Sequence, residues 1–220
     1  MLTIADVLTA EDLARVREGL GAASFLDGRR TAGAAAKKVK SNQQADGSDP
    51  KVKALAAFVR QALERSPAFV AFARPQRWSR MLFSKYAPGD QYGFHTDDAS
   101  MEGAEGYRMR SDLSFTLFLS DPDTYEGGAL LIDGLDGERE FRPAAGTVVL
   151  YSTGQLHRVT PITRGERLAA VGWIHSMVSR SDEREVVFDL QRVRWSLPEG
   201  QPRLLLDKAI GNLLRMWGKP

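Results

Sequence analysis

The feature that most constrains the fold is a series of short apolar and β-branched segments in the middle of the chain. Turn-forming pairs such as Gly127-Gly128 and Asp136-Gly137 separate these segments. Short strands divided in this way are typical of a sandwich or barrel rather than of alternating β/α units. The predicted strands occupy residues 78–86, 112–120, 129–133, 147–151, 156–161 and 167–178.

Helical patterns flank this β-rich part on both sides. Leu13, Val16 and Leu20 recur at helical spacing. Thr9 and Asp12 form a capping-box pattern at the start of that helix. Further helices are predicted to start at residue 50, at residue 181 or 182, and at residue 204. We therefore expect an N-terminal helical and loop region (1–75), a β core (76–180) and a C-terminal helical extension (181–220).

Charge and composition exclude several classes of protein. The 220 residues include 30 basic and 28 acidic side chains, and this net charge of +2 does not favour nucleic acid or membrane as a partner. The chain has no cysteine, which excludes disulfides, thiolate metal sites and cysteine nucleophiles. No apolar run approaches the roughly 18 residues needed to cross a bilayer, and no signal-peptide pattern is present. We therefore expect a cytoplasmic protein.

Residues 27–50 lack large apolar side chains except for Val39. They form either a surface loop or a loop that covers a site, and composition favours the surface loop. Lys37, Lys38 and Lys40 make a short basic run without interleaved aromatic residues. Such a run is usually solvated and falls short of a nucleic-acid-binding stripe.

Two of the three histidines occupy positions suited to metal binding. His95 and Asp97 are separated by one residue, so in an extended segment their side chains project from the same face. His157 lies in another predicted strand. Two histidines and one carboxylate can occupy one face of an octahedral metal ion and leave three positions open, as in non-haem Fe(II) oxygenases. Each residue alone is a weak signal, because a single histidine is more often structural.

Arg167 strengthens the metal-site hypothesis. It follows His157 by ten residues, beyond a turn at 163–165, so we expect it on the neighbouring antiparallel strand and close to that histidine. A guanidinium there can hold a dicarboxylate through paired hydrogen bonds. The alternative is a solvated strand arginine, and the combination of H-x-D, His and Arg in this order favours the binding role.

These motifs resemble those of the bacterial PKHD-type hydroxylases, which are prolyl-4-hydroxylase-like Fe(II)- and 2-oxoglutarate-dependent dioxygenases. The resemblance extends over nearly the whole chain and makes residues 27–50 a family segment. The matching stretches are Asp27-Gly28-Arg29, Thr31-Ala32-Gly33, Val39-Lys40, and residues 86–97, 110–120, 156–167 and 173–177. The implied fold is mainly β with flanking helices: a double-stranded β-helix, or jelly-roll (cupin-like) barrel, with N-terminal helices and a C-terminal helical extension.

The resemblance also implies ligands. His95, Asp97 and His157 would bind Fe(II), and Arg167 would bind the far carboxylate of 2-oxoglutarate, with ascorbate as a reductant.

Related prolyl hydroxylases carry a cosubstrate-binding tyrosine where Phe118 stands in this chain. We therefore expect Thr116 or Tyr86 to supply that hydroxyl. Relatives usually carry glutamine where this chain has His175, so His175 is expected to be a structural or rim residue and not a metal ligand.

The expected activity is hydroxylation of a peptidyl, amino-acid or siderophore-like substrate, with a link to iron homeostasis. One alternative is a non-enzymatic metal- or oxoacid-binding sensor on the same barrel, which the complete set of ligands argues against. Another is an AlkB-type nucleic-acid demethylase, which the near-neutral charge argues against.

Three further residues are candidates for the substrate rim: Arg108, Arg110 and Tyr92. The alternatives are a solvated charge cluster for the arginines and barrel-wall packing for Tyr92. The apolar stripe of the last predicted helix, 204–214, would dock on the barrel or on a second subunit, the latter giving a homodimer.

Overall fold

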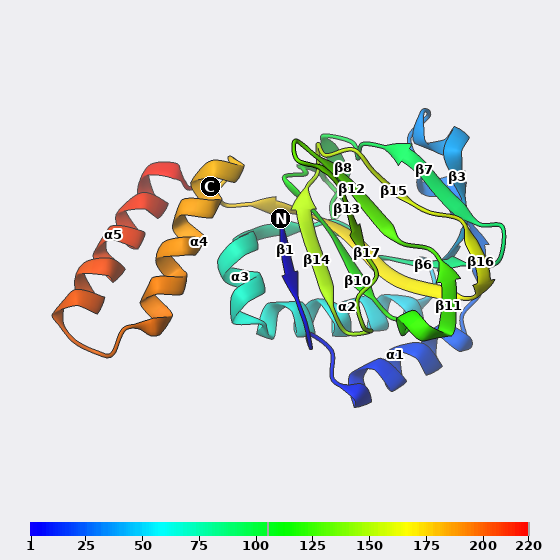
Figure 1. Ribbon diagram of the computed structural model, residues 1–220, viewed down its shortest axis with the longest axis horizontal. Helices are drawn as coiled ribbons and strands as arrows, with labels where there is room; N and C mark the ends of the chain where they lie inside the picture. The colour runs from blue at the N-terminus through cyan, green and yellow to red at the C-terminus, as the bar shows by residue number, and fades with distance from the viewer. Residues whose placement is uncertain (105, 220) are drawn as a thin grey trace.

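The computed structural model describes residues 1–104 and 106–219, and it forms a barrel of two main β-sheets with helices outside (Figure 1). The larger sheet contains, in spatial order, β1 (Leu2–Ile4), β14 (Val148–Ser152), β10 (Leu113–Phe118), β17 (Arg167–Ser176), β6 (Leu82–Tyr86), β4 (Gln43–Ala45) and β2 (Phe25–Asp27), with β5 (Pro75–Trp78) also paired to β17. The smaller sheet contains β13 (Gly137–Phe141), β12 (Leu130–Gly134), β15 (His157–Val159), β7 (Gln91–His95) and β3 (Lys40–Ser41). Two ribbons pair β11 (Tyr125–Gly127) with β16 (Ile162–Gly165) and β8 (Ser100–Glu102) with β9 (Arg108–Arg110).

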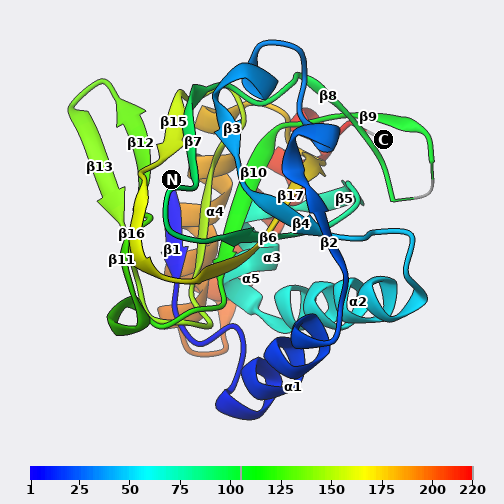
Figure 2. The same cartoon turned by 90° about the vertical axis from the view of Figure 1, so that its right-hand side faces the viewer.

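The helices lie outside the barrel. The first three, α1 (Ala10–Gly21), α2 (Pro50–Arg65) and α3 (Pro67–Ala73), lie against one side of the barrel (Figures 1 and 2). The last two, α4 (Ser181–Ser196) and α5 (Gln201–Trp217), form a hairpin that extends away from the barrel (Figure 1). Short 3₁₀ helices are η1 (Gly28–Thr31), η2 (Ala36–Val39) and η3 (Pro122–Thr124). The expected double-stranded β-helix with flanking helices is therefore confirmed.

Strand β10 shows why this sequence builds a two-layered structure. All six of its residues are buried, but they alternate between two environments. Leu113, Phe115 and Leu117 belong to the hydrophobic core that includes the helices. The intervening residues, Ser114, Thr116 and Phe118, lie on the opposite face, because successive side chains of a strand point to opposite sides.

An aromatic cluster joins helix α3 to the larger sheet. The ring of Phe69 in α3 stacks on Trp78 of β5 at 5.6 Å between centroids, and it meets the edge of Phe115 at 6.2 Å. Phe69 and Phe115 are almost fully buried. Aromatic burial of this kind supplies a large share of core stability, so this cluster anchors the helical layer to the barrel.

The predicted start of the first helix is confirmed. The backbone N–H of Thr9 donates to Oδ2 of Asp12 at 3.2 Å, and the backbone N–H of Asp12 donates to Oγ1 of Thr9 at 3.1 Å. This reciprocal pair is the capping box that the sequence predicts.

Several strands were not expected from the sequence. Strands β1 to β4 come from the N-terminal 45 residues, and β7, β8, β9, β11, β13 and β16 also lie outside the predicted segments. Strands β1 to β4 are only two or three residues long, which is too short for an alternating pattern, and β13 is almost entirely exposed. Residues 27–50 therefore contain ordered strands and turns that join both sheets.

The expected neighbour of Arg167 was wrong. The strand of His157, β15, pairs with β12 and β7, whereas the strand of Arg167, β17, pairs with β10, β6 and β5. Between them the chain forms β16, which pairs with β11. Arg167 thus enters the other sheet, and its register partner is Tyr86.

Among the described residues, no helix is long and apolar enough to span a membrane. On α5, Leu204, Leu205 and Met216 are exposed. A homodimer through this helix stays a prediction, as does the absence of nucleic-acid binding.

We predict that Phe69→Ala lowers the free energy of unfolding by about 3–5 kcal/mol, because it leaves a cavity between α3 and the sheet. Urea unfolding followed by circular dichroism measures this change. Leu135→Ala is the matched control, since Leu135 is fully exposed, and it should change stability by no more than about 0.5 kcal/mol. Equal effects of the two variants would contradict the assigned core.

Candidate metal centre

Two strands of the smaller sheet bring the two candidate histidines together. His95 is the last residue of β7, His157 is the first residue of β15, and the two are direct register partners. Their ring centroids lie 4.2 Å apart. Asp97 lies two residues beyond the end of β7, so it does not share a strand face with His95 as the sequence analysis assumed.

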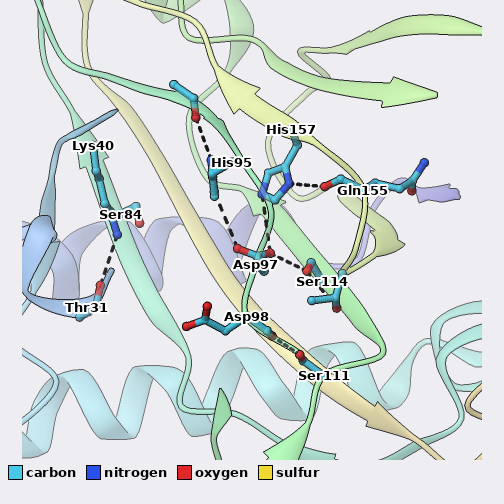
Figure 3. A network of polar contacts seen from close by, with 12 residues as sticks. Thr31, Lys40, Ser84, His95, Asp97, Asp98, Ser111, Ser114, Gln155 and His157 are labelled. Carbon is cyan, nitrogen blue, oxygen red and sulfur yellow. Dashed lines mark hydrogen bonds and ion pairs between the residues drawn. The ribbon is translucent and has the colours of Figure 1, made fainter. Parts of the chain in front are cut away.

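The three side chains form a compact cluster (Figure 3). Nε2 of His95 lies 3.7 Å from Oδ1 of Asp97, and Nε2 of His157 lies 3.6 Å from Oδ2 of Asp97. One ligand atom from each residue lies within 4.8 Å of the others. All three side chains are at most 9% exposed. The cluster therefore offers two imidazoles and one carboxylate to one ion.

Hydrogen bonds to backbone carbonyl oxygens fix the tautomer of both histidines. Nδ1 of His95 lies 2.8 Å from the carbonyl oxygen of Gly93, and Nδ1 of His157 lies 2.9 Å from that of Gln155. A carbonyl oxygen only accepts, so Nδ1 carries the proton in each ring and Nε2 presents its lone pair to the cluster. Burial, with the neighbouring His157 as a second cause, lowers the pKa of His95 to about 4. This imidazole is therefore neutral at neutral pH.

Ser114 orients the carboxylate. Its Oγ donates to Oδ2 of Asp97 at 2.7 Å, and Oγ1 of Thr153 lies 3.3 Å from the same hydroxyl. Ser114 projects from the barrel face of β10, so the strand that fills the core also positions a candidate metal ligand. Ser114 is not evident from the sequence, because nothing local links it to Asp97 across 17 residues.

Arg167 is buried inside the barrel. It is 1% exposed, and its guanidinium carbon lies 5.3 Å from the ring centroid of Tyr86 and 5.0 Å from that of Phe118. Within the described part of the chain, its Nε and Nη2 have no hydrogen-bond partner. Gly128 makes room for this side chain, since a Cβ there would lie 3.0 Å from Cδ of Arg167. Unpaired buried donors on a guanidinium fit a carboxylate ligand.

The two expected cosubstrate hydroxyls come from the larger sheet, from the two strands that flank β17. Tyr86 and Thr116 both line the pocket that contains His95, Asp97 and His157. Burial raises the pKa of Tyr86, so its phenol stays protonated and able to donate. Tyr151, which no local sequence pattern singles out, also lines the pocket.

The ring of Tyr151 lies 4.9 Å from that of His157. Burial also raises the pKa of Tyr151, so it is a second protonated phenol beside the cluster. Its strand, β14, is next to β10 in the larger sheet, and only this pairing reveals its position.

Residues 27–50 form part of the pocket wall. Thr31, Ala32, Gly33, Ala36 and Lys40 belong to its lining. The composition-based preference for a surface loop is thus wrong for this segment. The solvated state expected for the basic run is also wrong for Lys40, which is 7% exposed.

The rim candidates separate into two groups. Tyr92 lines the pocket, and its ring stacks on His95 at 3.6 Å between centroids. The arginines are engaged elsewhere: Nε of Arg110 donates to Oδ1 of Asp112 at 2.7 Å, and Nε of Arg108 donates to Oγ of Ser100 at 3.1 Å. Neither belongs to the pocket lining, and neither does His175.

Comparisons with known proteins agree with this geometry. The family model described as the 2OG-Fe(II) oxygenase superfamily matches residues 81–175, which include the cluster and Arg167. A PKHD-type hydroxylase of Maricaulis maris is 45% identical, and the alignment covers 100% of this chain and 99% of the relative. A second, from Picosynechococcus, is 46% identical over 98% of both chains.

The chain belongs to the PKHD-type hydroxylase family. As a member of this family it is an enzyme of the 2OG-Fe(II) oxygenase class.

Solved structures support the fold of this PKHD-type hydroxylase. A prolyl-4-hydroxylase of Pseudomonas putida matches with a TM-score of 0.53 at 23% identity, covering 80% of this chain and 91% of that one. A prolyl hydroxylase of Trichoplax adhaerens, solved with a hypoxia inducible factor peptide fragment, matches with a TM-score of 0.58 at 17% identity, covering 84% and 86%. At these identities the likeness concerns the fold alone.

The donor set of this hydroxylase fits the metal that its family name implies. Two imidazoles and one carboxylate on one side of an ion are the protein ligands of non-haem Fe(II) oxygenases. Nδ1 of each histidine is already bonded to a backbone carbonyl, so both rings are held in the ligating tautomer.

We predict that His95→Ala, Asp97→Ala and His157→Ala each weaken Mn(II) binding by more than the ~10–100-fold typical for loss of an outer-shell partner, because each removes a ligand. Calorimetric titration under anaerobic conditions measures this affinity, and circular dichroism checks that the fold survives. His175→Gln is the control and should bind Mn(II) as the parent does. Full affinity after any two of the three alanine changes would contradict the assignment.

Proposed function

We propose that this protein is an Fe(II)- and 2-oxoglutarate-dependent dioxygenase that hydroxylates a peptidyl, amino-acid or siderophore-like substrate, with a link to iron homeostasis. The observation that carries the proposal is the pair of donors on buried Arg167 that have no partner among the described residues, in the barrel that holds the cluster of His95, Asp97 and His157. Binding of iron together with a 2-oxoacid requires a set of metal ligands and a cation that binds a carboxylate. One barrel contains candidates for both. Ascorbate is proposed as the reductant that keeps iron in the Fe(II) state.

The protein side chains hold and orient the reactants. His95, Asp97 and His157 would hold iron, and Ser114 keeps the carboxylate of Asp97 in position. When bound, iron and 2-oxoglutarate supply the oxygen activation and the oxidising power.

Arg167 would hold the far carboxylate of 2-oxoglutarate. The rings of Tyr86 and Phe118 beside it exclude water, which strengthens the charge pair. Tyr86 and Thr116 are the proposed hydroxyl donors to the cosubstrate. The side chains of the site therefore act by orientation, and no side chain in this scheme acts as a general base.

The alternatives explain less of the site. A sensor would need no open metal positions, whereas a set of three ligands leaves three. Membership of a hydroxylase family also favours an enzyme. An AlkB-type demethylase would need a basic groove with stacking aromatic residues, but Lys37 and Lys38 are exposed on a segment without aromatic side chains.

Succinate formation tests the proposed activity directly. Incubation with Fe(II), 2-oxoglutarate, oxygen and a cell extract should release succinate and yield a product heavier by one oxygen, both detected by mass spectrometry. Asp97→Ala should form neither product. Succinate release that does not depend on Fe(II) or on Asp97 would contradict the proposal.

Arg167→Gln should weaken 2-oxoglutarate binding by ~30-fold or more, because losing one partner of a desolvated charge pair costs about 2–5 kcal/mol. Arg167→Lys should weaken it less, since lysine keeps the charge and loses only the planar two-point geometry. Titration of 2-oxoglutarate into anaerobic Mn(II)-loaded protein measures both. Parental affinity in the glutamine variant would show that another residue binds the carboxylate.

A further inference from the structure

A second buried cation of the barrel, Lys40, lines the pocket that contains His95, Asp97 and His157, whereas Arg167 is not part of that lining. Lys40 begins strand β3, pairs with Tyr92 of β7 and lines the pocket, with 7% of its surface exposed. Its neighbours Lys37 and Lys38 are exposed. Burying one lysine of a basic run is unfavourable unless the charge meets a partner, so the position of Lys40 requires an explanation.

The protein itself gives this ammonium few partners. Nζ of Lys40 donates to Oγ1 of Thr31 at a long 3.3 Å (Figure 3). It lies 4.9 Å from the ring centroid of Tyr92. Nowhere in the described residues does a carboxylate oxygen lie within 4.0 Å of Nζ. A lysine ammonium has three donors, so at least one remains available to a ligand. Burial lowers the pKa of Lys40 to about 8, which leaves the charged form dominant at pH 7.

The two carboxylates that act on Lys40 from a distance are committed to other partners. They are Asp97 and Asp27. Asp97 belongs to the cluster of His95, Asp97 and His157. Asp27 pairs with Arg29, and Nε of Arg29 lies 2.9 Å from Oδ2 of Asp27. The remaining charged lining residue, Asp98, is exposed to solvent.

The charges of the loaded site leave Lys40 uncompensated. The positive charges of Fe(II) and Arg167 equal the negative charges of Asp97 and 2-oxoglutarate. A buried ammonium is then left over in the space beside the metal. The indole Nε1 of Trp173, which lines the same pocket, is a further buried donor without a partner in the described residues. This pocket therefore favours a negatively charged third component.

We propose that Lys40 binds a carboxylate of the primary substrate, which makes that substrate a carboxylate-bearing molecule. The inference rests on the proposed function, because the charge balance assumes iron and 2-oxoglutarate. It favours a free amino acid or another organic acid over an internal residue of a peptide, whose own carboxyl group is an uncharged amide. The segment that carries Lys40 thus supplies substrate specificity to a barrel whose other cation serves the cosubstrate.

Acetate and acetamide test this inference, since they have the same shape and differ in charge. Each is added to protein loaded with Mn(II) and 2-oxoglutarate, and the relaxation of its methyl protons by Mn(II) is measured by nuclear magnetic resonance. Acetate should be relaxed strongly and acetamide weakly. Lys40→Met should weaken acetate binding about tenfold, as for a hydrogen bond to a charged group, and Lys40→Arg should retain most of it.

Calorimetry on the same samples separates the possible failures. Mn(II) and 2-oxoglutarate should bind Lys40→Met as tightly as the parent. A loss of 2-oxoglutarate affinity like that of Arg167→Gln would make Lys40 a cosubstrate ligand and overturn the inference. Equal relaxation of acetate and acetamide, or unchanged acetate binding in Lys40→Met, would also overturn it. Failure of the parent to bind Mn(II) or 2-oxoglutarate would instead contradict the proposed function, on which this inference rests.

Thermal unfolding of the metal-free protein distinguishes binding from a structural role. Lys40→Met should have the same unfolding midpoint as the parent or a higher one, because methionine replaces an uncompensated buried charge with an apolar side chain of similar length. A lower midpoint would show that Lys40 stabilises the fold and would contradict the proposed role.

Discussion

Strand β10 is buried on both faces, so its side chains must fit two different environments at once. The arrangement of the core and of the candidate site depends on this strand. Its outer face carries Leu113, Phe115 and Leu117 into the core shared with the helices. Its inner face carries polar groups, and Ser114 bonds to a candidate metal ligand. Because side chains alternate along a strand, one register sets both faces. A shift by one residue would place the serine in the core and phenylalanine beside Asp97.

The interior of the barrel is consequently mixed: apolar residues such as Phe118 and Leu130 pack there, and buried charged groups lie among them, in contrast to the core outside it. Arg167, Asp97 and Lys40 are held there with few or no ion-pair partners from the protein itself. Each such group is unfavourable in isolation, and we propose that each binds a different component: a dicarboxylate, a metal ion and a further anion. In these proposals, the charges that are costly to bury are also the groups that select the ligands.

Local signals predicted much of the architecture. The capping box of Thr9 and Asp12, the central strands and the two C-terminal helices all follow from patterns within about ten residues. The strands of two or three residues near the N-terminus did not, because their stability comes from pairing with distant strands and not from their own sequence. Arg167 was assigned to the wrong neighbour for the same reason, since the intervening β16 carries the chain from one sheet to the other.

The sequence alone determined the chemistry available to this protein. With no cysteine and only three histidines, the H-x-D motif, one later histidine and one strand arginine were the available candidates for a metal and oxoacid site. Tertiary structure decided which groups are buried and what they face. It buried Lys40 while leaving Lys37 in solvent, and it brought Ser114 and Tyr151 to the cluster. Residue type sets what a side chain can bind, whereas burial and partners come from strand pairings between residues far apart in the chain, which no local pattern contains.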